Sequence, residues 1–150
     1  MRRLIAALAL MLTSSTAHAE KVKAVHDGDT FSLSGTVTIY KLPLAVRVLG
    51  IDTPELWNAK CPEEHAEADK ARIFTTELIS KAGWAVTLTD VAWDKYGGRI
   101  DAHVSVMSNG KLLRLDKALI DADLAVPYFG QGPKRDWCAH LAAKAFSETK

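Results

Sequence analysis

Cysteine is scarce in this sequence, in which Cys61 and Cys138 are the only two among 150 residues. A metal site built from cysteines alone is therefore not expected. An excess of one charge is also lacking, because 19 lysine and arginine residues face 18 acidic residues and leave a formal net charge of +1. Proteins that wrap a long duplex usually carry a basic patch, so any contact with nucleic acid should be local.

Long apolar segments are missing after the first 19 residues. The N-terminus has two arginines after the initial Met, an apolar run from Leu4 to Leu12, and the small-residue end Ala17-His18-Ala19. The run is too short to span a bilayer comfortably, and the order of the three parts is typical of a secretory signal peptide rather than a buried helix. We predict that residues 1–19 are this signal peptide and that the mature chain begins near Glu20.

Export would change the net charge of the mature chain and the expected state of its two cysteines, and it raises the question of a membrane anchor. Loss of the two N-terminal arginines lowers the formal charge from +1 to about −1. No lipobox cysteine lies near the cleavage site, so we expect a secreted or periplasmic protein with no stable membrane association. An oxidising compartment favours a disulfide between Cys61 and Cys138, with two free thiols as the alternative.

The mature chain has the size and composition of one α+β domain, residues 20–150, without repeats or low-complexity tracts. The first half holds short segments rich in β-branched or aromatic residues, separated by Asp-Gly, Ser-Gly and Leu-Pro, which predict an antiparallel meander. Two more strand-like segments follow the first helix. The strand segments are Val22–Val25, Thr30–Leu33, Thr36–Tyr40, Leu44–Leu49, Ala85–Thr89 and Ile100–Met107.

Three helices are predicted among and after these strands. The first begins near Pro62, places Ala71, Phe74, Leu78 and Ala82 on one face, and stops at Gly83. After an Asn-Gly turn signal at positions 109–110, residues 112–120 return to helical spacing. A last helix over residues 137–146 can be capped by Asp136. In total we expect about five strands and about three helices.

Two acidic blocks carry the most specific chemistry, His-Asp-Gly-Asp-Thr at residues 26–30 and Gly-Ile-Asp-Thr-Pro-Glu at residues 50–55. Calcium takes six to eight oxygen ligands, and Asp29 and Asp52 in separate turns can hold it without filling its coordination sphere. Pro54 favours an extended Thr53, whose carbonyl can then lie beside Asp52. These residues predict a calcium site with open positions.

Three further residues complete a phosphodiesterase pattern. Glu55 follows the metal ligands and can act as a general base toward water. Arg47, before the second acidic block, and Arg99, after the Asp-Lys-Tyr-Gly-Gly segment at 94–98, carry planar guanidinium groups that match pairs of phosphate oxygens. The order of these groups predicts hydrolysis of phosphodiester bonds.

The two acidic blocks, the arginines and the 94–99 segment together resemble the staphylococcal-type thermonucleases, calcium-dependent nucleases built on a five-stranded OB-fold β-barrel. The resemblance covers roughly residues 22–128. It implies metal binding by Asp29, Asp52 and Thr53, base catalysis by Glu55, and phosphate binding by Arg47 and Arg99. It also implies a supporting carboxylate at Asp27 and a nucleotide pocket at Lys95, Tyr96 and Tyr128. The implied cofactor is Ca²⁺, and the implied product carries a 3′-phosphate.

The expected function is therefore an exported calcium-dependent nuclease that acts as a monomer on DNA or RNA, single-stranded or short. One alternative is a noncatalytic OB-fold module that binds single strands. Another is a calcium-stabilised envelope protein, which calcium but no nucleotide would stabilise. We interpret the Lys134-Arg135 pair as a solvated loop and the four tryptophans as core or rim packing residues, with stacking on bases as the alternative.

Overall fold

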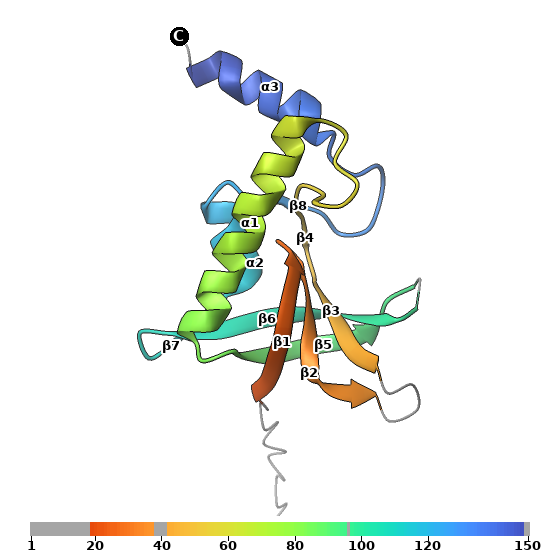
Figure 1. Ribbon diagram of the computed structural model, residues 1–150, viewed down its shortest axis with the longest axis vertical. Helices are drawn as coiled ribbons and strands as arrows, with labels where there is room; N and C mark the ends of the chain where they lie inside the picture. The colour runs from red at the N-terminus through yellow and green to blue at the C-terminus, as the bar shows by residue number, and fades with distance from the viewer. Residues whose placement is uncertain (1–18, 38–41, 96, 149–150) are drawn as a thin grey trace, which may run out of the picture.

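The computed structural model describes residues 19–37, 42–95 and 97–148. It contains a closed five-stranded β-barrel and three helices, which confirms the predicted α+β class (Figure 1). Most of the predicted signal peptide and Tyr96 lie outside the described residues. The strands are β1 Ala19–Asp27, β2 Thr30–Val37, β3 Leu42–Val48, β4 Ile51–Asp52, β5 Ala85–Trp93, β6 Arg99–Ser108, β7 Lys111–Arg114 and β8 Val126–Pro127, and the helices are α1 Pro62–Lys81, α2 Leu115–Asp121 and α3 Trp137–Glu148.

The barrel is built from β1, β2, β3, β6 and β5. Antiparallel pairing joins β1 to β2, β2 to β3, β5 to β6 and β1 to β5. The barrel closes where β3 pairs in parallel with β6, in the register Val46 opposite Ile100. This mixed closure of five strands is consistent with an OB-fold. Strand β7 extends the sheet beyond β6, and β4 pairs separately with β8.

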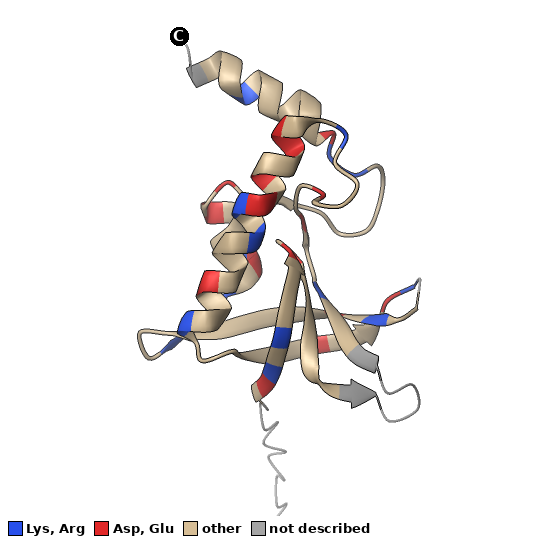
Figure 2. Ribbon diagram, in the orientation of Figure 1, with Lys and Arg blue, Asp and Glu red and all other residues tan. Residues whose placement is uncertain are grey.

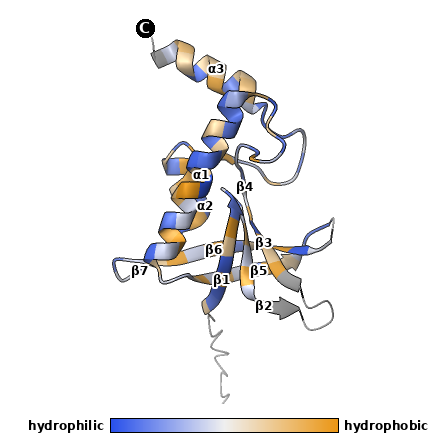
Figure 3. Cartoon of the chain, in the orientation of Figure 1, coloured by the Kyte–Doolittle hydropathy of each residue, from blue (hydrophilic) through white to orange (hydrophobic). Residues whose placement is uncertain are grey.

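Alternating burial fills the barrel interior. Along β6 the side chains of Ile100, Ala102, Val104 and Val106 are buried, as the period of two in a strand requires. Phe31 of β2 is fully buried in the same core. In Figure 3 the hydrophobic positions of the strands contrast with the largely hydrophilic segment between β8 and α3.

Helix α1 begins and ends where the sequence predicts. Pro62 is its first residue, and Gly83 follows its end with a φ of +68°. Of the predicted apolar face, Ala71 is buried, while Phe74 and Leu78 are partly buried against the barrel core. The helix packs along β1 and reaches α3 with its N-terminal half (Figure 1). Asp136 caps α3 as expected, because its Oδ1 accepts a hydrogen bond of 3.1 Å from the Ala139 N–H.

Two predicted boundaries are wrong. The segment predicted as a helix from Leu112 to Ile120 begins as strand β7, and α2 starts only at Leu115. The turn at Asn109 and Gly110, with φ of +48° and +75°, folds the chain back so that Leu112 and Leu113 pair with β6. The predicted separate strands at 30–33 and 36–40 form one strand, β2, through Val37, with an irregular register after Ser32. Residues 38–40 lie outside the described residues.

The predicted disulfide joins Cys61, just before α1, to Cys138 in the first turn of α3. The bond is consistent with an oxidising compartment. Within residues 19–37, 42–95 and 97–148, no helix is long and apolar enough to cross a membrane.

Removing this disulfide with Cys61→Ser and Cys138→Ser should lower the thermal midpoint of unfolding. The bond closes a loop with a sequence separation of 77, and loop-closure entropy alone accounts for up to about 4.5 kcal/mol. Thermal unfolding followed by circular dichroism should give the same loss for the double variant and for reduced wild-type protein. Equal midpoints for the oxidised wild type and the double variant would show that the bond adds no stability.

Candidate functional site

The first acidic block forms the tight turn between β1 and β2. Gly28 and Asp29 are buried there, and Gly28 O accepts a 2.7 Å hydrogen bond from Thr75 Oγ1 of α1. A side chain at position 28 has no room, because a Cβ atom would lie 2.7 Å from Ala71 Cβ and 2.9 Å from Thr53 Cγ2. Glycine thus lets this turn pack directly against the second acidic block.

The second block follows β3 and is fixed by the β4–β8 pairing. Asp52 is opposite Val126 in that pair, and Asp52 and Thr53 are 1% and 4% exposed. Asp52 Oδ2 accepts a hydrogen bond of 3.1 Å from the indole N–H of Trp137, at the start of α3. The other oxygen, Oδ1, is therefore the one left to face positive charge.

Arg47 lies between the two acidic blocks. Its Nη2 is 3.2 Å from Asp29 Oδ2 and 3.6 Å from Asp52 Oδ1, and it donates a longer hydrogen bond of 3.4 Å to Ile51 O. Burial lowers the pKa of the guanidinium, but the combined attraction of the surrounding carboxylates, Asp29 first and Asp52 next, raises it above its ordinary value. Arg47 is held charged at the point where the two blocks meet.

Glu55 extends from the second block toward the loop before α3. Its backbone N–H donates to the buried Glu64 Oε1 at 3.3 Å, while its own carboxylate accepts a 2.6 Å hydrogen bond from Lys134 Nζ. The Glu55 side chain is 40% exposed, so water can reach it. Lys134 Nζ also lies 3.0 Å from Asp52 Oδ1 as an ion pair.

The inner site carries more negative than positive charge. Four carboxylates, of Asp27, Asp29, Asp52 and Glu55, face the two cations Arg47 and Lys134. Burial, followed by the charge of Asp29, raises the pKa of Asp27 to about 7. Asp27 Oδ1 and Asp52 Oδ1 are buried and accept no hydrogen bond from the residues that the structure describes. Such oxygens are the groups that a bound cation would satisfy.

Asp29, Asp52 and the Thr53 carbonyl fit calcium in donor chemistry and charge, since all three offer oxygen and the carboxylates outnumber the cations Arg47 and Lys134 even when Asp27 is protonated. The carboxylates do not form a closed cage, because Arg47 Nη2 stands between them. Among the described residues, the one set of three potential ligand side chains with atoms within 4.8 Å of one another is Cys61, Glu64 and Cys138. The disulfide already joins those two sulfurs.

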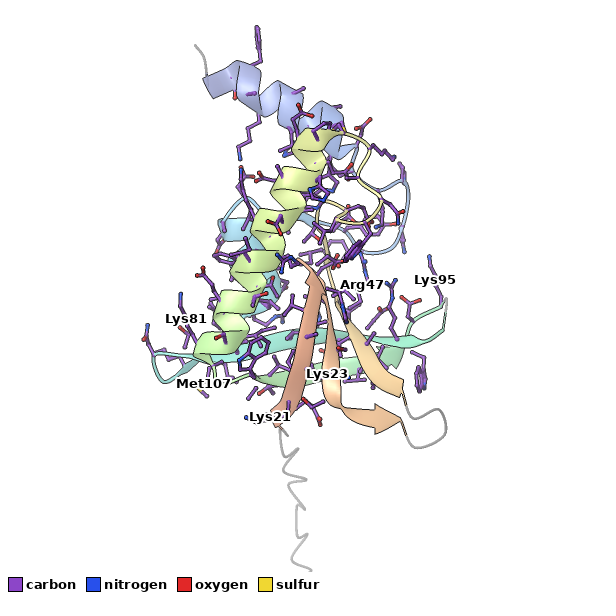
Figure 4. The ribbon with its side chains drawn as sticks, viewed as in Figure 1. Lys21, Lys23, Arg47, Lys81, Lys95 and Met107 are labelled. Carbon is purple, nitrogen blue, oxygen red and sulfur yellow. A yellow bond between two sulfur atoms is a disulfide. The ribbon has the colours of Figure 1, made fainter. Side chains whose placement is uncertain are left out.

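One cleft of about 910 Å³ holds nearly all the predicted site residues. Figure 4 shows Arg47 on β3 and Lys95 at the tip of the β5–β6 turn on the same side of the barrel. Figure 2 shows acidic positions at the end of β1 and in the loop after β4 beside a basic position of β3. Asp52 is buried and does not itself line the cleft, but its Oδ1 lies 3.6 Å from Nη2 of Arg47, which does. The predicted site residues that line the cleft are Asp27, Asp29, Arg47, Thr53, Glu55, Lys95, Arg99 and Tyr128.

Arg99 reaches the cleft despite the two glycines before it. Gly97 and Gly98 both have positive φ, +76° and +77°, and the Gly97 N–H donates to Asp94 O at 3.0 Å. The Arg99 Nε then donates to Asp94 Oδ2 at 2.8 Å, and the arginine side chain stays 30% exposed. Asp94 therefore orients the guanidinium through its Nε, in a side chain that remains partly exposed at the cleft.

Sequence reasoning missed four residues of the site. Lys134 lies in an exposed loop as predicted, but it also pairs with Glu55 and Asp52. Trp137 packs in the interior and donates a hydrogen bond to Asp52. Trp93 and Phe129 line the cleft while 68% and 81% exposed, so neither serves as a core residue. Nothing in the motif at 50–55 indicates that Glu55 and Asp52 contact Lys134 and Trp137, about 80 residues later in the chain.

No protein-family model matches this chain, and no curated protein matches it. The assignment of a function therefore depends on the site itself.

Replacing Asp27 with Asn should stabilise the calcium-free protein clearly more at pH 8 than at pH 5. With a pKa of about 7 in the folded protein against 3.8 for an unperturbed aspartate, folded Asp27 keeps a proton that the unfolded chain has lost. Stability therefore falls as pH rises through that window. The stabilisation by the variant should be larger at pH 8 than at pH 5 by roughly 1–3 kcal/mol. Urea unfolding at both pH values measures it, and an equal difference at pH 5 and pH 8 would contradict this origin.

Proposed function

We propose that the chain is an exported, calcium-dependent nuclease that hydrolyses phosphodiester bonds of DNA or RNA. One observation carries this proposal: Arg47 lies between the buried carboxylates Asp29 and Asp52, in the same cleft as Glu55 and Arg99. A nuclease needs a base, positive charge for the phosphate and hard oxygen ligands for a divalent cation. The cleft brings all three together.

Asp29, Asp52 and the Thr53 carbonyl would hold calcium, which supplies positive charge to a bound phosphate. Arg47 and Arg99 bind the phosphate oxygens and stabilise the charge that develops there during attack. Glu55, 40% exposed and held by Lys134, takes a proton from the attacking water. Lys95 and Tyr128 lie along the cleft, where they contact the nucleotides next to the cleaved bond.

The substrate class follows from the shape and charge of the cleft. Its volume of about 910 Å³ suits a few nucleotides rather than a long duplex, and the mature chain has no excess of basic residues. The exposed rings of Trp93 and Phe129 offer stacking surfaces for unpaired bases. Single-stranded or short DNA and RNA are therefore the proposed substrates of a monomer in the periplasm or outside the cell.

The same two exposed rings favour the second candidate, an OB-fold module that binds single strands without cleaving them. The candidates differ in one measurable respect. We would incubate the chain from Glu20 with labelled single-stranded DNA and RNA, measuring binding by fluorescence anisotropy with a chelator and products on a gel with calcium. Cleavage that needs calcium supports the nuclease, whereas tight binding with intact strands in calcium would replace it by the binding module.

A further inference from the structure

Residues 128–136, which we call the strap, connect β8 to α3 and cross the acidic site. Both ends are fastened. At one end β8 pairs with β4, and the Tyr128 N–H donates to Gly50 O at 2.9 Å. At the other end Trp137 binds Asp52 and Cys138 is bonded to Cys61. The strap is therefore held at the site independently of any bound ligand.

Lys134 is the residue that the strap places in the acidic site. Its Nζ lies 2.6 Å from Glu55 Oε1 and 3.0 Å from Asp52 Oδ1. Asp52 is 1% exposed, and its other oxygen is already bound to Trp137. Oδ1 is paired with two cations, Lys134 Nζ at 3.0 Å and Arg47 Nη2 at 3.6 Å, so Lys134 is the nearer source of positive charge at a buried oxygen suited to a divalent cation.

We propose that Lys134 is a tethered cation of the acidic site, which a divalent cation must displace from Asp52 in order to bind. The inference rests on the calcium site proposed above and adds to it a residue that sets the affinity of that site. The ammonium of Lys134 and the divalent cation compete for the same carboxylate oxygen.

Distance and charge explain the competition. Calcium binds oxygen ligands at about 2.3–2.6 Å, so an ion on Asp52 Oδ1 would lie within about 6 Å of an ammonium at its present position. Like charges at that distance repel, most strongly where burial limits screening. Calcium therefore binds more weakly while Lys134 remains at Asp52.

Lys134 can leave Asp52 without leaving the site. Glu55 Oε1 is the closer of its two partners, and it is also the more exposed one. Lys134 also borders a second hollow of about 300 Å³ between β8 and the strap, which gives its side chain room to move. Upon calcium binding, Lys134 gives up Asp52 and keeps Glu55, so the base stays positioned.

The test is calcium affinity, measured by isothermal titration calorimetry on the disulfide-bonded chain from Glu20 without nucleic acid. Lys134→Met removes the competing charge and should lower the dissociation constant for calcium about three- to tenfold. Lys134→Gln should behave in the same way, whereas Lys134→Arg keeps the charge and should stay near wild type. Lys81→Met, which removes an exposed lysine paired with Glu77 on α1, is the matched control.

If the wild type binds calcium but neither the Met nor the Gln variant binds it more tightly, the proposed role of Lys134 is wrong. The calcium site itself would then still stand. A wild type that binds no calcium would overturn the metal site and this inference together. If the Lys134 variants bind calcium more tightly but no form of the protein cleaves nucleic acid, the inference stands and the nuclease proposal fails. Circular dichroism of each variant confirms that the folded protein is being titrated.

Discussion

Replacing Glu55 with glutamine is expected to lower the rate of calcium-dependent hydrolysis by about 10²–10⁴, the range for loss of a general base. Glutamine has nearly the same shape and cannot accept the proton from water. The fold should survive, because the Glu55 side chain is 40% exposed and the hydrogen bond to Glu64 comes from the backbone of residue 55. Initial rates on single-stranded DNA at saturating calcium measure the effect.

Glu77→Gln is the matched control for this variant. Glu77 is an exposed carboxylate on α1 that also pairs with a lysine, Lys81 at 3.3 Å, but it lies outside the cleft. Its hydrolysis rate should equal that of the wild type. A Glu55→Gln protein that is folded and hydrolyses at the control rate would remove Glu55 from the chemistry and require another base.

Arg47→Lys is expected to lower the hydrolysis rate about 10²- to 10³-fold, the loss typical of removing one preorganised donor to developing charge. A lysine ammonium is a point charge and cannot donate two parallel hydrogen bonds to a phosphate. It also cannot reproduce the geometry of Arg47, whose Nη2 contacts Asp29 and Asp52 while the group remains in the cleft. The charge is conserved, so the variant isolates the shape of the guanidinium.

Arg72→Lys provides the control for that substitution, because Arg72 pairs with Asp69 on the surface of α1. Near-UV circular dichroism should show that both variants keep their tertiary packing. Full activity in Arg47→Lys would mean that positive charge alone suffices at this position. The proposal that Arg47 acts through two parallel hydrogen bonds to a phosphate would then be wrong.

The strands of the barrel could be predicted from local patterns because each is marked by residues near it in sequence. The closed barrel, in contrast, was expected only from the family resemblance, since it depends on the pairing of β3 with the distant β6. The strand-like segment before the Asn-Gly turn at 109–110 predicted β6, and the Asp-Gly turn at 27–28 separated β1 from β2. Helix α1 was delimited by Pro62 and Gly83. The start of α2 was misplaced because Leu112 and Leu113 suit either helix or strand, and their pairing with β6 decided the outcome.

Part of the site was equally predictable. Asp29 and Asp52 each belong to a short polar motif at the end of a strand, and the structure places both against Arg47. The contact that brings the blocks together, between Gly28 and Thr53, has no counterpart in the linear sequence. The glycine could be interpreted there only as a turn residue.

Lys134 and Trp137 could not be predicted because their partners are distant in the chain. Lys134 reaches Glu55 across 79 positions, and Trp137 reaches Asp52 across 85. Charge and hydropathy near residue 134 describe a polar loop, and only the tertiary fold shows where that loop lies. The position of that loop is fixed by the disulfide and by the pairing of β4 with β8. Strands β4 and β8 are each only two residues long, too short to be recognised in the sequence.

The central claim is that the acidic cleft hydrolyses phosphodiester bonds when calcium is bound. The most direct test is the initial rate of cleavage of single-stranded DNA and RNA by the chain from Glu20, over a calcium titration and in excess chelator. The account predicts hydrolysis that saturates with calcium and stops in chelator. Folded protein that binds calcium but cleaves neither polymer at any calcium concentration would contradict it.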